Sequence, residues 1–138
     1  MVEHIALGSL DTPIGVLWMA CSERGVCKLV FPCEESQAAL DRWLAVQLPV
    51  HELAATSALL AQASTELGEY FAGTRHDFTL PLDLRGRLFH QRVWLALTNI
   101  PYGHTVSYGD LARRLGAPKA ARAVGAACGA NPVPIIAP

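Results

Sequence analysis

The sequence predicts an α/β domain over residues 1–84, followed by a mainly α, helix-turn-helix domain over residues 88–138. Three observations predict this order. The first third alternates apolar runs with turn residues, as an antiparallel meander does. The middle third places apolar residues at helical spacing. The last third contains three short helix-like segments separated by turns. With 138 residues and 51% hydrophobic content, the chain is long enough to bury a core.

The meander is predicted from its turns. Apolar residues at 5–10, turn chemistry at 11–15 and a strand-like run at 16–21 together predict a hairpin. A second polar turn at 22–25 ends in Gly25, which is able to take a positive φ. The run 26–31 is again β-branched and apolar until Pro32 ends it, so it predicts a third strand.

Two helices and an extended segment are predicted next. Apolar residues fall at helical spacing from Glu34 until Pro49, and again over residues 59–71, where Gly73 closes the helix. Residues 78–84 alternate apolar and polar side chains, which is typical of an edge strand or an extended linker. Residues 85–87 read as the boundary between the two domains.

The last third predicts helices at 88–99, 108–115 and 119–129, with turns at 100–103 and 116–118. Ser107 is expected to cap the second of these helices through its side-chain oxygen. Pro118 is expected at the entry of the third, where its fixed φ fits and no amide donor is needed.

Charge and composition limit the classes of function. The net charge of −1 and pI of about 6.5 argue against bulk electrostatic binding of nucleic acid, so DNA contact would need a local patch. The patch predicted here consists of Arg113, Arg114 and Lys119, as a phosphate clamp. No apolar run reaches the roughly 18 residues of a membrane span, and no signal peptide is evident, so a cytoplasmic protein is expected.

The predicted third helix is unusual because small residues occupy nearly every position and one arginine, Arg122, stands among them. Such a face could enter the narrow minor groove, and Arg122 could occupy the place of an extruded nucleotide. Two ordinary interpretations remain open, namely close packing against another helix and a solvated surface charge.

Six segments stand out by their order and spacing, namely Leu10–Gly15, Phe89–Trp94, Ile100–Gly103, Ser107-Tyr108, Arg122–Gly125 and Asn131-Pro132. In that order and spacing they resemble the O6-alkylguanine-DNA alkyltransferase (methylated-DNA--protein-cysteine methyltransferase) family. The resemblance implies a ribonuclease-H-like N-terminal domain and a winged-helix-like helix-turn-helix domain that binds the minor groove. It implies that the protein, acting as a monomer without a cofactor, flips O6-alkylguanine (or O4-alkylthymine) out of double-stranded DNA and transfers the methyl or alkyl group to its own cysteine.

The resemblance also implies roles for individual residues. Tyr108 matches the tyrosine that crowds a backbone phosphate and helps to rotate the nucleotide, and Arg122 matches the intercalating arginine. Asn131 matches an asparagine at the hinge between the recognition helix and the active-site loop. Lys119 and Ala121, on the same predicted helix, are also expected to contact DNA.

The reactive cysteine is expected directly after Pro138, where the family has Cys-His-Arg. The chain is therefore expected to be a fragment with an incomplete C-terminal domain, without a catalytic residue and inactive alone.

The thiols should be free, and Cys128 is disfavoured as a substitute nucleophile because it lies on the recognition helix. No metal is expected, although Cys27 falls near a zinc position of some members. His90 is expected at the surface. The remaining cysteines, Cys21 and Cys33, are expected to be small buried hydrophobes like Cys27.

Two other functions remain open. The first is a non-catalytic alkyltransferase-like protein that binds and flags alkylated DNA; such proteins usually lack the N-terminal domain. The second is a regulatory helix-turn-helix protein that reads the major groove, which an alanine-rich helix is poorly equipped to do.

Overall fold

The computed structural model describes residues 3–32, 36–49, 51–54 and 57–137. The chain divides into two compact units, Met1–Asp83 and Leu84–Pro138, which are described separately. None of the helices in these described ranges is both long enough and apolar enough to span a bilayer.

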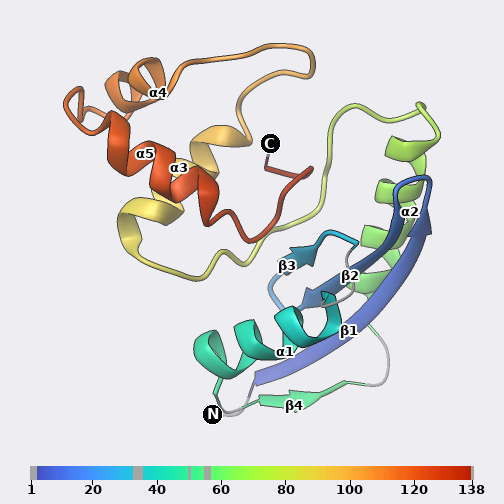
Figure 1. Ribbon diagram of the computed structural model, residues 1–138. Coiled ribbons are helices and arrows are strands. Elements are labelled where there is room, and N and C mark those ends of the chain that lie inside the picture. Colours follow the sequence, from blue (N-terminus) through green and yellow to red (C-terminus); the bar gives the residue numbers. More distant parts are fainter. Residues whose placement is uncertain (1–2, 33–35, 50, 55–56, 138) are drawn as a thin grey trace. The chain divides into compact units, whose positions relative to one another are not determined.

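The first unit is built on a four-stranded sheet with the strand order β3-β2-β1-β4 (Figure 1). Strands β1 (Glu3–Thr12), β2 (Gly15–Cys21) and β3 (Val26–Val30) form the predicted antiparallel meander. Strand β4 (His51–Leu53) pairs with β1 in parallel and was not predicted. Three residues are too few to display a two-residue period, so the pairing partner alone defines this strand.

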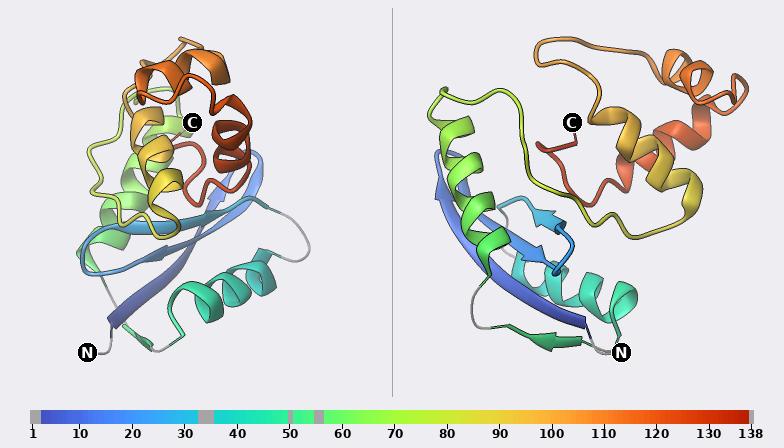
Figure 2. Two further views of the ribbon diagram at one scale, coloured as in Figure 1. Left: turned by 90° about the vertical axis from the view of Figure 1, so that its left-hand side faces the viewer. Right: turned by 180° about the vertical axis from the view of Figure 1, so that it is seen from behind.

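Two helices cover the two faces of the sheet (Figure 2). Helix α1 (Ser36–Gln47) packs through Leu40 and Leu44 against a cluster that includes Ile5 of β1. Helix α2 (Ala58–Phe71) lies on the other face, where Leu60 approaches the backbone of Gly8 so closely that a Cβ there would be 2.9 Å from it. Ile5 and Gly8 are three residues apart on β1 and therefore point to opposite faces.

Gly25 corrects one expectation, because its φ is not positive. Its function is to allow close approach: a Cβ at this position would lie 2.5 Å from the Pro81 carbonyl oxygen. The Val26 amide donates to that oxygen over 3.0 Å, and the Asp83 amide donates to the Val26 carbonyl over 2.9 Å. The segment 78–84, predicted as edge strand or linker, is thus extended and makes one isolated parallel bridge, between Val26 and Leu82.

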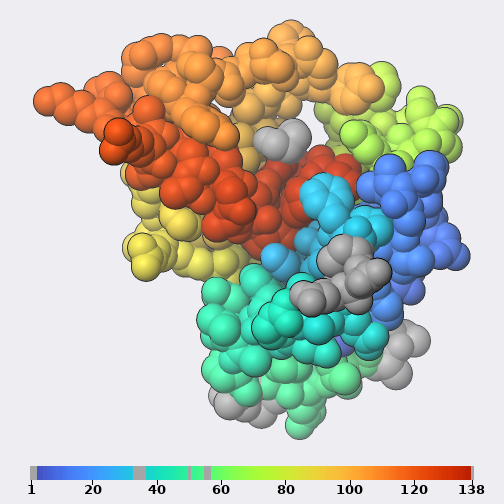
Figure 3. Space-filling model, in the orientation of Figure 1, coloured from blue at the N-terminus to red at the C-terminus, as the bar shows by residue number. Residues whose placement is uncertain are grey.

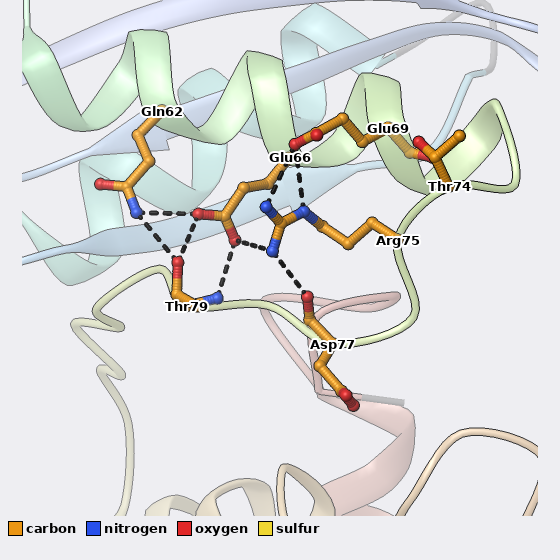
Figure 4. A network of polar contacts seen from close by, with 7 residues as sticks. All are labelled: Gln62, Glu66, Glu69, Thr74, Arg75, Asp77 and Thr79. Carbon is orange, nitrogen blue, oxygen red and sulfur yellow. Dashed lines mark hydrogen bonds and ion pairs between the residues drawn. The ribbon is translucent and has the colours of Figure 1, made fainter.

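A buried carboxylate holds the same segment to α2 (Figure 4). Glu66 is 3% exposed and accepts hydrogen bonds from the Thr79 amide and hydroxyl, both over 2.7 Å, and from Gln62 over 2.8 Å. Arg75 Nη1 lies 3.6 Å from Glu66 and Arg75 Nη2 lies 3.1 Å from the more exposed Glu69. Burial acts to raise the pKa of Glu66, but these hydrogen bonds and the Arg75 charge outweigh it and hold the pKa below its usual value.

The second unit is helical. Helix α5 (Ala121–Gly129) packs against both α3 (Leu88–Leu97) and α4 (Tyr108–Arg114). The core of this unit lies between the three helices and the segment that follows α5. Its buried residues include Val93, Trp94, Leu97, Leu111, Ala112, Val124, Ala127, Val133, Ile136 and Ala137.

The beginning of α5 differs from the prediction. Pro118 and Lys119 lie in a turn, and the helix starts two residues later than expected, at Ala121. The Ala117 amide donates to Ala112 over 2.9 Å and the Ala120 amide donates to Ala117, also over 2.9 Å, so the chain turns before the helix begins. Gly116, with φ +75°, supplies the left-handed residue that this connection requires.

Candidate nucleic-acid interface

Helix α4 begins as the sequence predicts. The Ser107 hydroxyl accepts a hydrogen bond from the Asp110 amide over 3.0 Å and so caps the helix. This cap places Tyr108 at the first helical position, where the residue is 55% exposed. Its ring lies beside Gly125 of α5, where a Cβ would be 3.2 Å from Cε2. Tyr108 therefore belongs to the surface that α4 and α5 form together. The atoms of these two helices lie next to each other on the face shown in Figure 3, where they are coloured orange to red.

Helix α5 has a buried face and an exposed face. Val124 and Ala127 are fully buried, whereas Arg122, Ala123 and Ala126 are exposed. The exposed alanines add little bulk to the helix, so a second surface can approach its backbone closely. This sidedness supports the interpretation of the small residues as an approach surface, because only part of the helix is used for packing within the unit.

Three predicted contact residues lie at or near the start of α5 and differ in exposure and position. Ala121 is the first residue of α5 and is partly buried. Lys119 is exposed but lies in the preceding turn, not on the helix as predicted. Arg122, in the first turn, is exposed. No hydrogen bond or ion pair joins Lys119 or Arg122 to any part of the chain that the structure describes, so both cations are available to a partner.

The predicted basic patch is less positive than its sequence indicates. Arg113 forms an ion pair with Asp110 one helical turn earlier. Hydrogen bonds from Ser107 and Arg113 hold the pKa of Asp110 below its ordinary value, so this carboxylate stays charged at neutral pH. Arg114 is exposed and has no such partner among the described residues. The positive charge that remains for an anionic ligand is therefore that of Arg114, Lys119 and Arg122.

Asn131 shapes the loop that follows α5. Its carboxamide oxygen accepts a hydrogen bond from the Val133 amide over 2.9 Å, and its nitrogen donates to the Ala137 carbonyl. The side chain thus bridges both ends of residues 131–137. Within this loop Ile135 has φ +76°, a left-handed conformation that a β-branched residue rarely adopts. The geometry indicates that Asn131 supports the loop from a partly buried position.

Two hydrogen bonds to the backbone of α5 and α4 were not foreseen from the sequence. The Trp94 indole nitrogen donates to the Ala127 carbonyl of α5 over 2.7 Å, and an Arg92 guanidinium nitrogen donates to the Leu115 carbonyl at the end of α4 over 2.6 Å. Both residues lie within the segment Phe89–Trp94, but sequence alone does not show which carbonyl they reach. The expectation for His90 also needs correction, since it is partly buried with its ring 5.7 Å from that of Trp94.

The described cysteines are poorly suited to act as nucleophiles. Burial raises the pKa of Cys21 to about 11, and it also raises the pKa of Cys128, so neither is a thiolate at neutral pH. Cys27 is buried, and its thiol donates to the Ala20 carbonyl over 3.3 Å. Cys33 lies outside the described residues. Within the described ranges, no three His, Cys, Asp or Glu residues are grouped to hold a metal ion.

Comparison with known proteins gives matches along both units. The model of the "6-O-methylguanine DNA methyltransferase, ribonuclease-like domain" family matches residues 5–84, and that of the "6-O-methylguanine DNA methyltransferase, DNA binding domain" family matches residues 88–138.

Individual relatives agree with these matches. The methylated-DNA--protein-cysteine methyltransferase of Mycolicibacterium paratuberculosis is 40% identical over the whole of this chain and 76% of its own length. The constitutive enzyme of the same name from Bacillus subtilis is 42% identical over 93% of this chain and 74% of its own. A crystal structure of Mycobacterium tuberculosis OGT in complex with DNA superposes with a TM-score of 0.74 at 39% identity, covering 98% of this chain and 74% of that one.

Proposed function

Because this chain belongs to the 6-O-methylguanine DNA methyltransferase family, we propose that it repairs DNA by direct reversal, moving an alkyl group from O6-alkylguanine to a cysteine of the protein. The observation that carries the proposal is the surface formed by α4 and α5. It combines an exposed tyrosine, Tyr108, with a cation, Arg122, that pairs with none of the described residues, on a helix whose other exposed residues are small. Those three properties suit entry into the minor groove and displacement of a nucleotide.

Each site residue has a distinct proposed part in DNA binding. Arg122 occupies the space that the flipped base leaves, and Tyr108 crowds the adjacent phosphate so that the nucleotide rotates out. Lys119 contacts a phosphate from the turn before α5, and Ala121 allows the start of the helix to approach the groove. Asn131 acts indirectly, because its two hydrogen bonds hold the loop 131–137 in shape.

The chemistry requires a thiolate, and we propose that the acceptor cysteine follows Pro138 in the complete protein. The thiolate sulfur attacks the alkyl carbon, an S–C bond forms as the C–O6 bond breaks, and the electron pair stays on the guanine, which then takes up one proton. The raised pKa values of Cys21 and Cys128 support an acceptor other than these residues. The transfer uses no cofactor, and each molecule reacts once.

We also propose a fold type for each of the two domains. Residues 1–84 would form a ribonuclease-H-like domain, and residues 88–138 a winged-helix-like helix-turn-helix domain. Monomeric state and a cytoplasmic location stay predictions. The alternative, a non-catalytic protein that flags alkylated DNA, is not favoured, because the relatives that match along the chain carry the name of a methyltransferase.

A transfer assay tests the proposal. The product of the complete gene is mixed with a duplex that contains one O6-methylguanine, and intact-protein and peptide mass spectrometry follow the methyl group. We expect one methyl group per protein molecule, on a cysteine outside residues 1–138. Methylation of Cys128 would refute the assignment of the acceptor, and binding without any methyl transfer would favour the flagging alternative.

A further inference from the structure

The contact between Tyr108 and Gly125 joins the two helices of the candidate interface. A Cβ built on Gly125 would lie 3.2 Å from Cε2, 3.3 Å from Cδ2 and 3.8 Å from Cζ of the Tyr108 ring. The two shorter distances are below an ordinary van der Waals contact between carbon atoms. The ring therefore lies directly against the backbone of α5, in space that any other residue at position 125 would claim.

The other glycines in the described helices do not have this property. A Cβ on Gly68 or Gly129 would have no neighbour within 4 Å, and on Gly109 the nearest atoms would be 3.8 Å away. Glycine is also unfavourable within a helix relative to alanine. Gly125 has a helical conformation without a positive φ, so backbone geometry does not require glycine there. Position 125 differs from these other glycines because the Tyr108 ring packs against it.

We infer that Gly125 is a positioning residue, whose missing side chain sets the height of the Tyr108 ring above α5. The inference rests on the proposed function, which assigns nucleotide rotation to Tyr108. Arg122 and Gly125 are three residues apart and are therefore neighbours on the helix surface. By receiving the Tyr108 ring, Gly125 fixes the spacing between the tyrosine of α4 and the arginine of α5, the two groups that act on one nucleotide.

Alanine at position 125 is expected to move the ring and to leave the fold intact. Tyr108 is more than half exposed, so its ring has open space into which it can shift by a few tenths of an ångström. Alanine also improves the helix propensity of α5. Because misplacement of a reacting or positioning group by about 1 Å can lower a rate about a hundredfold, this smaller shift should weaken flipping about fivefold.

The test compares Gly125→Ala with Gly68→Ala in the complete protein. Gly68→Ala is the matched control, since it makes the same change inside a helix where the new methyl group meets nothing. The probe is a duplex that contains O6-methylguanine beside a fluorescent base analogue, whose emission reports flipping, while anisotropy reports affinity. We expect Gly125→Ala to reduce flipping about fivefold with an affinity within about twofold of wild type, and Gly68→Ala to match wild type in both.

A double substitution separates positioning from direct obstruction of DNA. If Gly125 acts through the ring, Gly125→Ala has no further effect on flipping in a Tyr108→Ala background. An equal loss in both backgrounds would overturn the inference, because the new methyl group would then obstruct the DNA itself. Unchanged flipping by Gly125→Ala in the otherwise wild-type protein would overturn it as well.

A measurement without DNA makes failure of the inference distinct from failure of the proposed function. The Tyr108 ring should shift the NMR signals of the Gly125 α-protons, and this shift should vanish in Tyr108→Ala. Absence of this ring shift from the wild-type protein would overturn the inference whether or not the proposed function is correct. A clear ring shift combined with normal flipping by Tyr108→Ala would instead remove the proposed function of Tyr108, and with it the need for positioning.

Discussion

Replacement of Glu66 by glutamine tests whether a buried carboxylate holds the end of the first unit to helix α2. The substitution keeps the shape of the side chain and removes its charge. Glu66 is almost fully buried and accepts three hydrogen bonds of 2.7–2.8 Å, two of them from Thr79. The amide of glutamine can still accept from Thr79, but its nitrogen must face donors that previously met a carboxylate oxygen.

The expected loss follows from these contacts. Hydrogen bonds to a charged group contribute roughly 1.5–3 kcal/mol each, about twice the contribution of neutral ones, so losing the charge on three bonds removes roughly 2–4.5 kcal/mol. Loss of the carboxylate's own desolvation cost offsets part of this. Arg75 keeps its second partner, Glu69, so its guanidinium is not left unpaired. We expect Glu66→Gln to reduce the free energy of unfolding by about 2 kcal/mol.

Urea denaturation with Glu69→Gln as the control checks this value. Glu69 pairs with the same arginine, over 3.1 Å, but its side chain is 42% exposed, so its loss should cost less than about 1 kcal/mol. A loss of 2 kcal/mol shifts the urea midpoint by about 1 M if the slope m is about 2 kcal/mol/M. Equal midpoints for the two variants would refute the reasoning, since burial would then contribute nothing.

The pH dependence gives a second measure of the same interaction. The pKa of Glu66 in the folded protein lies below its usual value of 4.5. A carboxyl group of this kind contributes stability that is fully present above its unfolded pKa and is lost as pH falls through its folded pKa. The stability difference between wild type and Glu66→Gln should therefore be constant near neutral pH and shrink below about pH 4.5. A difference that grows on acidification would contradict the assignment.

Three further substitutions test the interface and the fold. Arg122→Ala should reduce flipping of a fluorescent base more than it reduces overall DNA affinity, because the lost contact is in the space of the flipped base and not at a phosphate. Equal flipping by the variant and the wild type would exclude intercalation. Arg92→Ala should lower the free energy of unfolding by about 1 kcal/mol and weaken DNA binding, because the Leu115 carbonyl at the end of α4 loses its donor. Arg92→Lys should restore part of the stability, measured by denaturation, and part of the DNA affinity, measured by anisotropy. Gly25→Ala should lower the free energy of unfolding by at least about 2 kcal/mol, since its methyl group would meet the Pro81 carbonyl, which is backbone and cannot move aside. A calorimetric transition equal to that of wild type would show that the segment 78–84 can move away from Gly25.

Features that depend on residues close together in the chain could be predicted from sequence patterns. Two tight turns and the apolar runs between them predict the antiparallel meander, and strands β1 to β3 have that arrangement. Ser107 directly before a helix-like segment predicts the cap of α4, and the cap forms. Helical periodicity also gave the positions of all five described helices to within a few residues at their ends. Such features arise because local hydrogen bonds and side-chain periods act within a few residues.

Features that depend on contacts between distant segments became visible only in the folded chain. Strand β4 exists because β1 offers it a pairing edge, and Gly25 is required because Pro81 approaches it. The partners of Trp94 and Arg92 lie 33 and 23 residues away, and the space that Gly125 leaves is filled by a ring from another helix. A sequence pattern shows which groups can donate, accept or leave room, but only the packed chain determines which of them meet.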